Sequence, residues 1–259
     1  MSQTILVTGS TSGFGRLMVE TLARQGHTVF AGMRDIAGKN AVAAEELRQL
    51  AAHEQTRLHV VETDVTDDAS IERAIASIIE TSGRLDVVVN NAGGAPAVPA
   101  DSASPRLHAK IIELNLLAPL HVSQAANAVM REQPEGGVIL MVGSVSGCRP
   151  SPGTAAYGAA KAGLHHLATS LAMEWAPRVR VNSLVVGPVA TGEGLDPAAV
   201  ARTVPMGRPA TPAEVAGACL LLASPLAGYV SGAALAVHGG GEWPGYLPDL
   251  RPATHPPQK

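Results

Sequence analysis

The sequence predicts a doubly wound α/β fold, in which a parallel sheet is covered by helices on both faces. Short runs rich in β-branched residues alternate with longer segments of helical pattern, which is the order of β-α-β units. The short runs are almost continuously apolar, so both faces of the sheet should be buried. We place a single domain at residues 1–240 and a Gly- and Pro-rich tail without regular structure at residues 241–259.

The individual elements follow from the same patterns. Helix formers without an interior proline predict a helix from Ala155 to Trp175. Thr211, Pro212 and Glu214 combine an N-cap, a first-turn proline and a capping-box acid, so a second helix should run to about Ala223. The expected strands are Thr4 to Thr8, Thr28 to Met33, Arg57 to Thr63, Leu85 to Asn90 and Gly137 to Gly143.

Composition excludes several classes of protein. The 259 residues are 46% hydrophobic, which is enough for a large core. A net charge of −3 leaves no basic surplus for nucleic acid or anionic membranes, and no apolar run is long enough to span a bilayer. Two cysteines are too few for a disulfide framework or a thiolate metal site, and the N-terminus has no signal-peptide pattern. We expect a cytoplasmic protein without a metal.

A glycine-rich turn separates the first expected strand from the helical pattern that follows it. Gly9, Gly13 and Gly15 lie in this turn, with Ser12 and Phe14 between them. Glycines let the backbone approach a pyrophosphate, whose charge is stabilised by free N–H groups at a helix N-terminus. Three glycines alone are weak support in a chain with 27 of them. Their position in the first β-α-β unit indicates a dinucleotide site.

The end of the second expected strand bears on the choice of dinucleotide. An acid there binds the 2′-hydroxyl of NAD, whereas an arginine accepts the 2′-phosphate of NADP. Met33 occupies the position of the acid and Arg34 follows it, so NADP(H) is favoured. Asp35 leaves NAD(H) open.

Together with the glycine turn, a further set of residues resembles the short-chain dehydrogenase/reductase family. The resemblance covers nearly the whole chain and includes Asn90 to Gly93, Asn115, Ser144, Tyr157 and Lys161. It implies a Rossmann fold, a hydride transfer between NAD(P)(H) and a ketone or secondary alcohol of modest size, and a homotetramer or homodimer.

The resemblance also implies the cofactor contacts. Asp64 and Val65 would lie at the adenine, and Thr191 at the nicotinamide amide. The remaining contacts would come from Asn91, Ala92 and Gly93 and from Gly187, Pro188 and Val189. Two departures stand out: Val186-Gly187-Pro188 replaces the Pro-Gly of the family, and His238 replaces an aspartate before the final glycine pair.

Tyr157 and Lys161 are four residues apart on the expected helix and therefore share one face. A tyrosine becomes a useful general acid or base near neutral pH when a nearby ammonium and a cationic nicotinamide lower its pKa. By resemblance, Lys161 also binds the nicotinamide ribose, Ser144 hydrogen-bonds the reacting oxygen, and Asn115 helps to hold a water in a proton relay. Each residue alone has an ordinary structural explanation, and their joint occurrence favours catalysis.

The substrate should bind beyond the carboxyl ends of the strands. We expect contacts from Ser144, Val145, Tyr157 and Gly187, with Arg149 as an unproven contact for an acidic group. Residues 192–206 are expected to form a mobile lid.

Three other interpretations stay open at this point. His165 and His166 point in different directions on the helix, so they are expected at its surface or at a subunit contact, with no metal between them. A catalytically silent nucleotide-binding regulator or scaffold could use the same fold, although all four catalytic groups are present. Dehydration or dehalogenation is a further alternative, which Lys161 and the glycine turn disfavour.

Overall fold

The structure, a computed structural model, describes residues 2–191 and 196–243. Within these residues seven strands form one sheet in the order β3-β2-β1-β4-β5-β6-β7, and each neighbouring pair is parallel. The strands are β1 (Thr4–Thr8), β2 (Thr28–Met33), β3 (Arg57–Glu62), β4 (Val87–Asn90), β5 (Gly137–Val142), β6 (Val179–Val186) and β7 (Ala234–Val237). The strand order reverses between β1 and β4, where ligands bind in such sheets.

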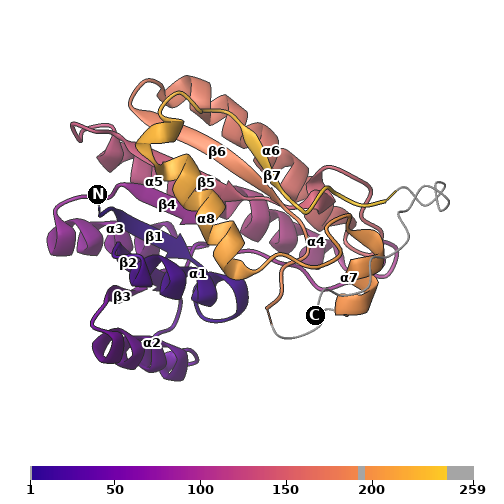
Figure 1. Cartoon of the computed structure of the whole chain (residues 1–259), viewed down its shortest axis with the longest axis horizontal. Helices are drawn as coiled ribbons and strands as arrows, with labels where there is room; N and C mark the ends of the chain where they lie inside the picture. The colour runs from indigo at the N-terminus through magenta and orange to yellow at the C-terminus, as the bar shows by residue number, and fades with distance from the viewer. Residues whose placement is uncertain (1, 192–195, 244–259) are drawn as a thin grey trace.

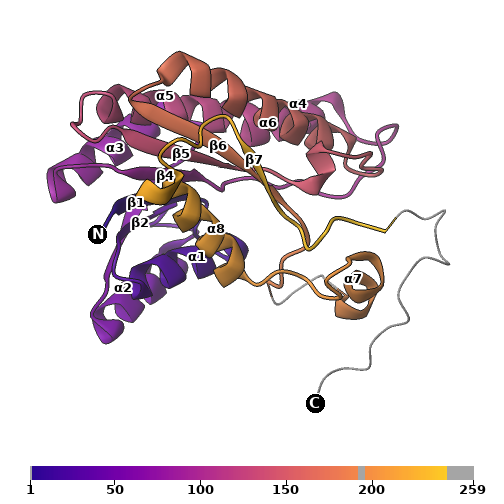
Figure 2. The same ribbon diagram turned by 45° about the horizontal axis from the view of Figure 1, so that its top comes forward.

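Helices cover both faces of the sheet, as Figures 1 and 2 show. One face carries α1 (Gly13–Arg24), α2 (Ala41–Glu54) and α8 (Pro212–Ala223), and the other carries α3 (Asp68–Ser82), α5 (Ala118–Met130) and α6 (Ala155–Trp175). A short α4 (Pro105–Ile112) leads through a π-helical turn, η1 (Glu113–Leu117), into α5. The 3-10 turns η2 (Val145–Gly147) and η3 (Pro225–Ala227) and the helix α7 (Pro197–Thr203) complete the described elements.

Side-chain alternation along each strand divides the core into two layers. Ile5 and Val7 of β1 pack on the side of α1, α2 and α8, whereas Leu6 packs on the side of α3, α5 and α6. All three side chains are at most 1% exposed. The doubly wound fold is thereby confirmed, because near-continuous apolar strands are what a sheet buried on both faces requires.

Most expected element boundaries agree with the structure. The helix Ala155–Trp175 has the predicted bounds, and α8 begins with the predicted capping box and ends at Ala223. β4 begins at Val87 rather than Leu85, because the side-chain amide of Gln133 bonds the backbone N–H and C=O of Leu85 at 2.8 and 2.9 Å. Those two backbone groups are therefore satisfied outside the strand ladder.

The C-terminal part of the chain differs from expectation in one place. The segment expected to be an irregular lid contains α7, which begins after Asp196 with its carboxylate accepting from Ala198 N at 2.9 Å. Residues 192–195 of that segment lie outside the described residues, as do residues 244–259 of the expected tail. Residues 241–243 are described and have neither helix nor strand. The domain boundary at residue 240 stays a prediction.

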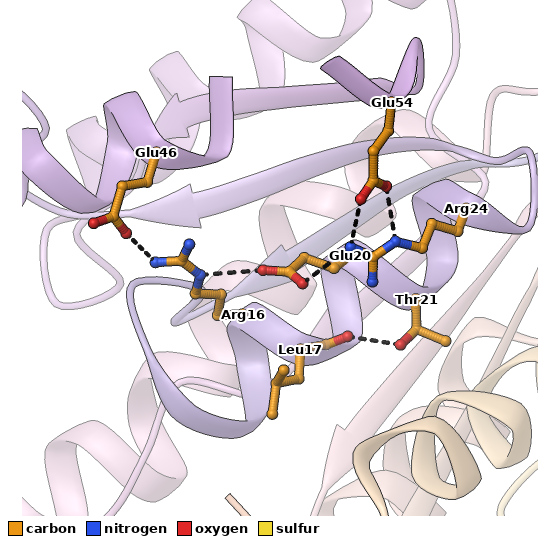
Figure 3. Close-up of polar contacts among 7 residues, drawn as sticks. All are labelled: Arg16, Leu17, Glu20, Thr21, Arg24, Glu46 and Glu54. Carbon is orange, nitrogen blue, oxygen red and sulfur yellow. Dashed lines mark hydrogen bonds and ion pairs between the residues drawn. The ribbon is translucent and has the colours of Figure 1, made fainter. Parts of the chain in front are cut away.

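Charged side chains connect α1 to α2 on the face of the sheet that both helices cover. Figure 3 shows Arg16 between Glu20 and Glu46, and Arg24 between Glu20 and Glu54. Both arginines thus bridge the two helices. Exposed ion pairs contribute little individually, but this connected set fixes how α2 lies against α1.

Candidate functional site

A cleft of about 540 Å³ lies across the carboxyl ends of the central strands. Its walls combine the segments that follow β1 to β6, so residues far apart in the sequence face one space. Of the predicted site residues, the cleft is lined by Gly9, Ser12, Phe14, Gly15, Arg34, Asp64, Val65, Asn91, Ala92, Gly93, Ser144, Tyr157, Lys161, Gly187 and Val189.

The glycine-rich turn that contains Gly9, Gly13 and Gly15 lies where β1 passes into α1. Ser12 occupies the N-cap position with an extended backbone, no side-chain cap, and no acid in the first turn of α1. The N–H groups of that turn therefore face the cleft side of the helix without a carboxylate competing for them. Gly15 is buried against the carbonyl of Gly9, where any side chain would collide with that oxygen and with the amide of Asn91.

The segment after β2 contains two charged residues, of which Arg34 lines the cleft and Asp35 does not. Met33 is 1% exposed, with its side chain in the core. Arg34 is exposed and lines the cleft. Asp35 has φ 51° and turns its carboxylate into its own loop, where Oδ2 accepts from Lys39 N at 2.8 Å. Of the two charged side chains in this segment, the one that lines the cleft is thus the guanidinium of Arg34.

Asp64 faces Arg34 from the segment after β3. Burial opposes its ionisation, yet hydrogen bonds from Thr66 and the charge of Arg34 hold the pKa of the carboxyl below its ordinary value. Thr66 donates through both its backbone N–H and its hydroxyl, at 3.0 and 2.7 Å. Asp64 is therefore ionised and fixed in one orientation.

A buried threonine connects the first and fourth strands behind the cleft. Thr8 Oγ1 accepts from the backbone N–H groups of Asn91 and Ala92 at 3.1 and 3.0 Å. The amide of Asn91 in turn donates to the carbonyl of Thr8 at 2.9 Å. These bonds hold the start of the glycine-rich turn against the segment after β4. The sequence analysis did not single out Thr8 as a supporting residue, although its place at the carboxyl end of β1 was a signal for it.

Asn115 lies in the π-helical turn η1 and is completely buried. Its amide exchanges two hydrogen bonds with the backbone of Gly94, each 2.9 Å long, and donates to the carbonyl of Ile111 at 2.9 Å. π-Helical turns often occur at functional sites because they redirect one side chain. Asn115 stands behind the cleft lining and fixes the wall that Gly93 and Gly94 form.

Tyr157 and Lys161 share one face of α6, as the spacing predicts. Lys161 Nζ lies 5.6 Å from the centre of the Tyr157 ring and donates to the carbonyl of Val142 at 2.8 Å. Lys161 is 3% exposed, and burial lowers the pKa of its ammonium to about 8. This helix therefore brings a phenol and a buried cationic group to one end of the cleft.

The Tyr157 hydroxyl lies close enough to Ser144, which follows β5, for the serine to affect its pKa. Burial raises the pKa of Tyr157 above its ordinary value, and the interaction with Ser144 opposes this only in part. Lys161 is therefore not enough to give the lowered pKa expected of a general base. That lowering requires further positive charge at the same end of the cleft.

Several predicted residues lie elsewhere. The described residues that line the cleft do not include Gly13, Asn115, Val145, Arg149, Pro188 or Thr191. The chain turns outward through η2 after Ser144, so Arg149 is exposed and its guanidinium pairs with Glu242 at 2.6 Å rather than facing the cleft. Pro188 lines a neighbouring hollow with His238.

The expectation for His165 was also wrong, although His166 is exposed as expected. His165 is half-buried, with Nδ1 3.0 Å from Ser183 Oγ and Nε2 3.3 Å from the carbonyl of Ser144. The four-residue spacing of His165 from Lys161 was the signal for this inward position. The lining residues that sequence reasoning missed include Thr11, Thr63, Thr66, Leu114, Val142 and Val186. Most adjoin a predicted site residue at a strand end.

A family model described as enoyl-(acyl carrier protein) reductase matches residues 9–242. L-rhamnose 1-dehydrogenase (NAD(P)(+)) of Azotobacter vinelandii is 34% identical over 248 residues, which cover 93% of this chain and 96% of the relative. The chain belongs to the short-chain dehydrogenase/reductase family.

Other proteins are similar to this chain over more than nine-tenths of their length. Cyclopentanol dehydrogenase of Comamonas sp. is 35% identical, with 91% of this chain and 95% of the relative covered. A crystal structure of a short-chain dehydrogenase/reductase from Burkholderia xenovorans superposes with a TM-score of 0.83 at 26% identity, covering 92% of this chain and 97% of that one. The chain is accordingly an oxidoreductase of the kind that uses NAD(P)(H).

The cleft fits the dinucleotide that the short-chain dehydrogenase/reductase family uses. The N-terminus of α1 has no side-chain cap, and Gly15 in its first turn has no room for a side chain beside the Gly9 carbonyl. This arrangement suits a pyrophosphate. Among the described residues no cluster of His, Cys, Asp and Glu could hold a metal ion, and no helix has the length and apolar character to cross a membrane.

Proposed function

We propose that this chain is an NADP(H)-dependent enzyme that interconverts a small neutral ketone and its secondary alcohol. One observation carries the proposal: Ser144, Tyr157 and the buried Lys161 line the same dinucleotide-sized cleft, with the Lys161 ammonium 5.6 Å from the centre of the Tyr157 ring. In this proposal Asn115, Ser144, Tyr157 and Lys161 are the catalytic set. Asn115 does not line the cleft; it contributes by hydrogen-bonding the backbone of Gly94 and so fixing the part of the cleft wall that Gly93 and Gly94 form.

The proton chemistry is assigned to Tyr157. Its hydroxyl would donate a proton to the carbonyl oxygen in reduction and accept one from the alcohol in oxidation. Ser144 would hydrogen-bond the same substrate oxygen and orient it toward the phenol. When bound, the nicotinamide supplies or accepts the hydride, and in its oxidised form it carries a positive charge. Lys161 would keep an ammonium close enough to favour the phenolate.

The dinucleotide would lie along the remaining wall. The turn containing Gly9, Ser12, Gly13, Phe14 and Gly15 would hold the pyrophosphate, and Asp64 and Val65 the adenine. Asn91, Ala92 and Gly93 would adjoin the central part of the cofactor, and Gly187, Pro188, Val189 and Thr191 the nicotinamide.

The preference for NADP(H) is supported by the charges at the adenosine end. Arg34 lines the cleft, whereas the carboxylate of Asp35 is bonded within its own loop and the side chain of Met33 is buried. A 2′-phosphate would find a guanidinium there, and a 2′-hydroxyl would find no carboxylate from this segment.

The substrate class is supported by apolar side chains in the lining of the cleft. Leu114, Val186 and Val189 are among these lining residues, which suits a neutral molecule of modest size. The names of the relatives include a cyclic alcohol and a sugar, so a ring-bearing secondary alcohol is a reasonable first probe.

We also propose a homo-oligomer, a tetramer or a dimer, in the cytoplasm. Leu226 and Tyr229, in and just after η3, are 92% and 104% exposed, and Leu221 of α8 is 54% exposed. Such apolar side chains near one helix end suit a subunit contact. Cys148 and Cys219 are both free, as expected in a reducing compartment.

The test replaces Tyr157 with phenylalanine and measures turnover of cyclopentanol and a panel of ketones at the nicotinamide absorbance. Tyr157→Phe should keep NADPH binding and lose a factor of about 100 to 10,000 in kcat, the range typical of a general acid or base. Thr81→Val, which removes an exposed hydroxyl from α3, is the control and should keep full activity. Undiminished activity of Tyr157→Phe would refute the assignment, and a wild-type protein that binds NADPH but turns over nothing would favour a nucleotide-binding regulator.

A further inference from the structure

Tyr157, Lys161 and His165 follow one another at intervals of four residues along one face of α6. The latter two both contact the chain that leaves β5. Lys161 Nζ donates to the carbonyl of Val142 at 2.8 Å, and His165 Nε2 lies 3.3 Å from the carbonyl of Ser144. These carbonyls belong to alternate residues of an extended segment, so α6 holds this segment at two points on either side of Gly143.

The second ring nitrogen of His165 connects the same helix to β6. Nδ1 lies 3.0 Å from the hydroxyl of Ser183, which is completely buried. A carbonyl oxygen can only accept, so Nε2 must carry the hydrogen that faces Ser144, and Nδ1 of the neutral ring then accepts from Ser183. Burial lowers the pKa of His165, with Ser144 opposing and Lys161 adding to the effect, which favours this neutral form.

The space above Gly143 is filled by the same ring. A side chain at Gly143 would collide with Cε1 of His165 and would lie 2.7 Å from its Nε2. The imidazole therefore occupies the volume that a larger residue would need. Contact between the ring and the glycine sets how closely α6 approaches the end of β5.

We propose that His165 is a positioning residue that fixes Ser144 relative to Tyr157. This inference rests on the function proposed above, because it concerns how the Ser144 hydroxyl is held at the phenol. Without the ring, the Ser144 carbonyl keeps the bond from Gly147 N at 2.9 Å but loses its connection to α6. Tyr157 is carried by α6 and Ser144 by the end of β5, so the two hydroxyls then lose one of the two hydrogen bonds that tie their segments together.

Three variants test this role. His165→Leu removes both ring hydrogen bonds, His165→Gln keeps one donor and one acceptor, and His166→Leu changes the exposed neighbour as a control. With cyclopentanol and NADP⁺, His165→Leu should lower kcat about 10- to 100-fold, the effect of a small misplacement of reacting groups. The Kd for NADPH should stay close to the wild-type value. His165→Gln should recover most of the loss, and His166→Leu should match wild type.

A second measurement does not depend on turnover. The ultraviolet tyrosinate difference between each protein and its Tyr157→Phe counterpart, with NADP⁺ bound, gives the apparent pKa of Tyr157. This pKa should rise in His165→Leu, because the interaction with Ser144 lowers it. Should His165→Leu fail to fold, Ser183→Ala removes one hydroxyl contact alone and should shift kcat and pKa in the same directions by smaller amounts.

The outcomes separate this inference from the function on which it rests. Wild-type kcat and an unchanged Tyr157 pKa in His165→Leu, with Tyr157→Phe inactive, would overturn the role of His165 and leave the proposed function standing. A fall in kcat matched by an equal loss of NADPH affinity would also overturn it, because the ring would then support the cleft in general. Full activity of Tyr157→Phe would instead refute the proposed function.

Discussion

Replacing Lys161 with methionine should stabilise the fold while it removes turnover. Lys161 is 3% exposed, and burial lowers the pKa of its ammonium from 10.5 to about 8. One pKa unit corresponds to about 1.4 kcal/mol, so keeping this group charged in the folded protein costs about 3 kcal/mol at neutral pH. Methionine is uncharged but loses the hydrogen bond that the ammonium donates to Val142, worth about 1.5 to 3 kcal/mol for a charged donor. The free energy of unfolding should therefore rise by up to about 1.5 kcal/mol and should not fall.

The difference in unfolding free energy between Lys161→Met and wild type should depend on pH in a predictable direction. Below pH 8 the lysine is charged in both the folded and the unfolded chain, and the full penalty is present. Between pH 8 and 10.5 the folded protein releases this proton while the unfolded chain keeps it, so wild type gains stability relative to the variant. The difference between the two proteins should narrow across this window.

Urea unfolding of the protein without added nucleotide measures both effects. Lys110→Met, at an exposed position of α4, is the matched control and should change the free energy of unfolding by less than about 0.5 kcal/mol. A Lys161→Met protein that is less stable than wild type at neutral pH would refute the reasoning, because burial would then not dominate the energetics of this lysine.

Two further variants test the remaining walls of the cleft. Arg34→Ala should weaken NADPH binding about 10- to 100-fold, the loss expected for a charged hydrogen bond, and leave NADH binding unchanged. A fluorescence titration measures both, with Lys39→Ala as control, and an equal loss for the two nucleotides would contradict the assignment. Asn115→Ala should lower the free energy of unfolding by about 1 to 3 kcal/mol, because the buried amide loses three hydrogen bonds to the backbone of Gly94 and Ile111. Urea denaturation tests this, and an unchanged midpoint and slope would contradict it.

The fold could be predicted because its signals are local. Apolar strands, the Thr211 capping box and the proline-free run of α6 each report on a few neighbouring residues, and the structure has them where the pattern indicates. The convergence of the strand ends on one cleft follows from parallel topology alone. The exception at Leu85 needed a side chain 48 residues away, that of Gln133, which no local pattern reports.

The site was less predictable where a side chain had two plausible partners. Asp35 and Arg149 could both have faced a ligand, but one carboxylate is bonded into its own loop and one guanidinium to Glu242. His165 continues the four-residue series of Tyr157 and Lys161, so its spacing was the signal for an inward position, and Gly143 leaves room there for the ring. The pKa of Tyr157 depends on burial, which opposes the effect expected from Lys161. These outcomes are decided by tertiary packing.

The bridges between α1 and α2 have a consequence for how this fold can vary. Asp35 and Asn40 close the loop at residues 34–40 with bonds inside the loop itself, and Arg16 and Arg24 anchor the helix that follows it. The loop is thus held by its own hydrogen bonds, and the helix α2 that follows it is held separately by ion pairs to α1. A substitution at Arg34 would therefore change the charge that this loop brings to the cleft without altering Tyr157 and Lys161, which are carried by α6.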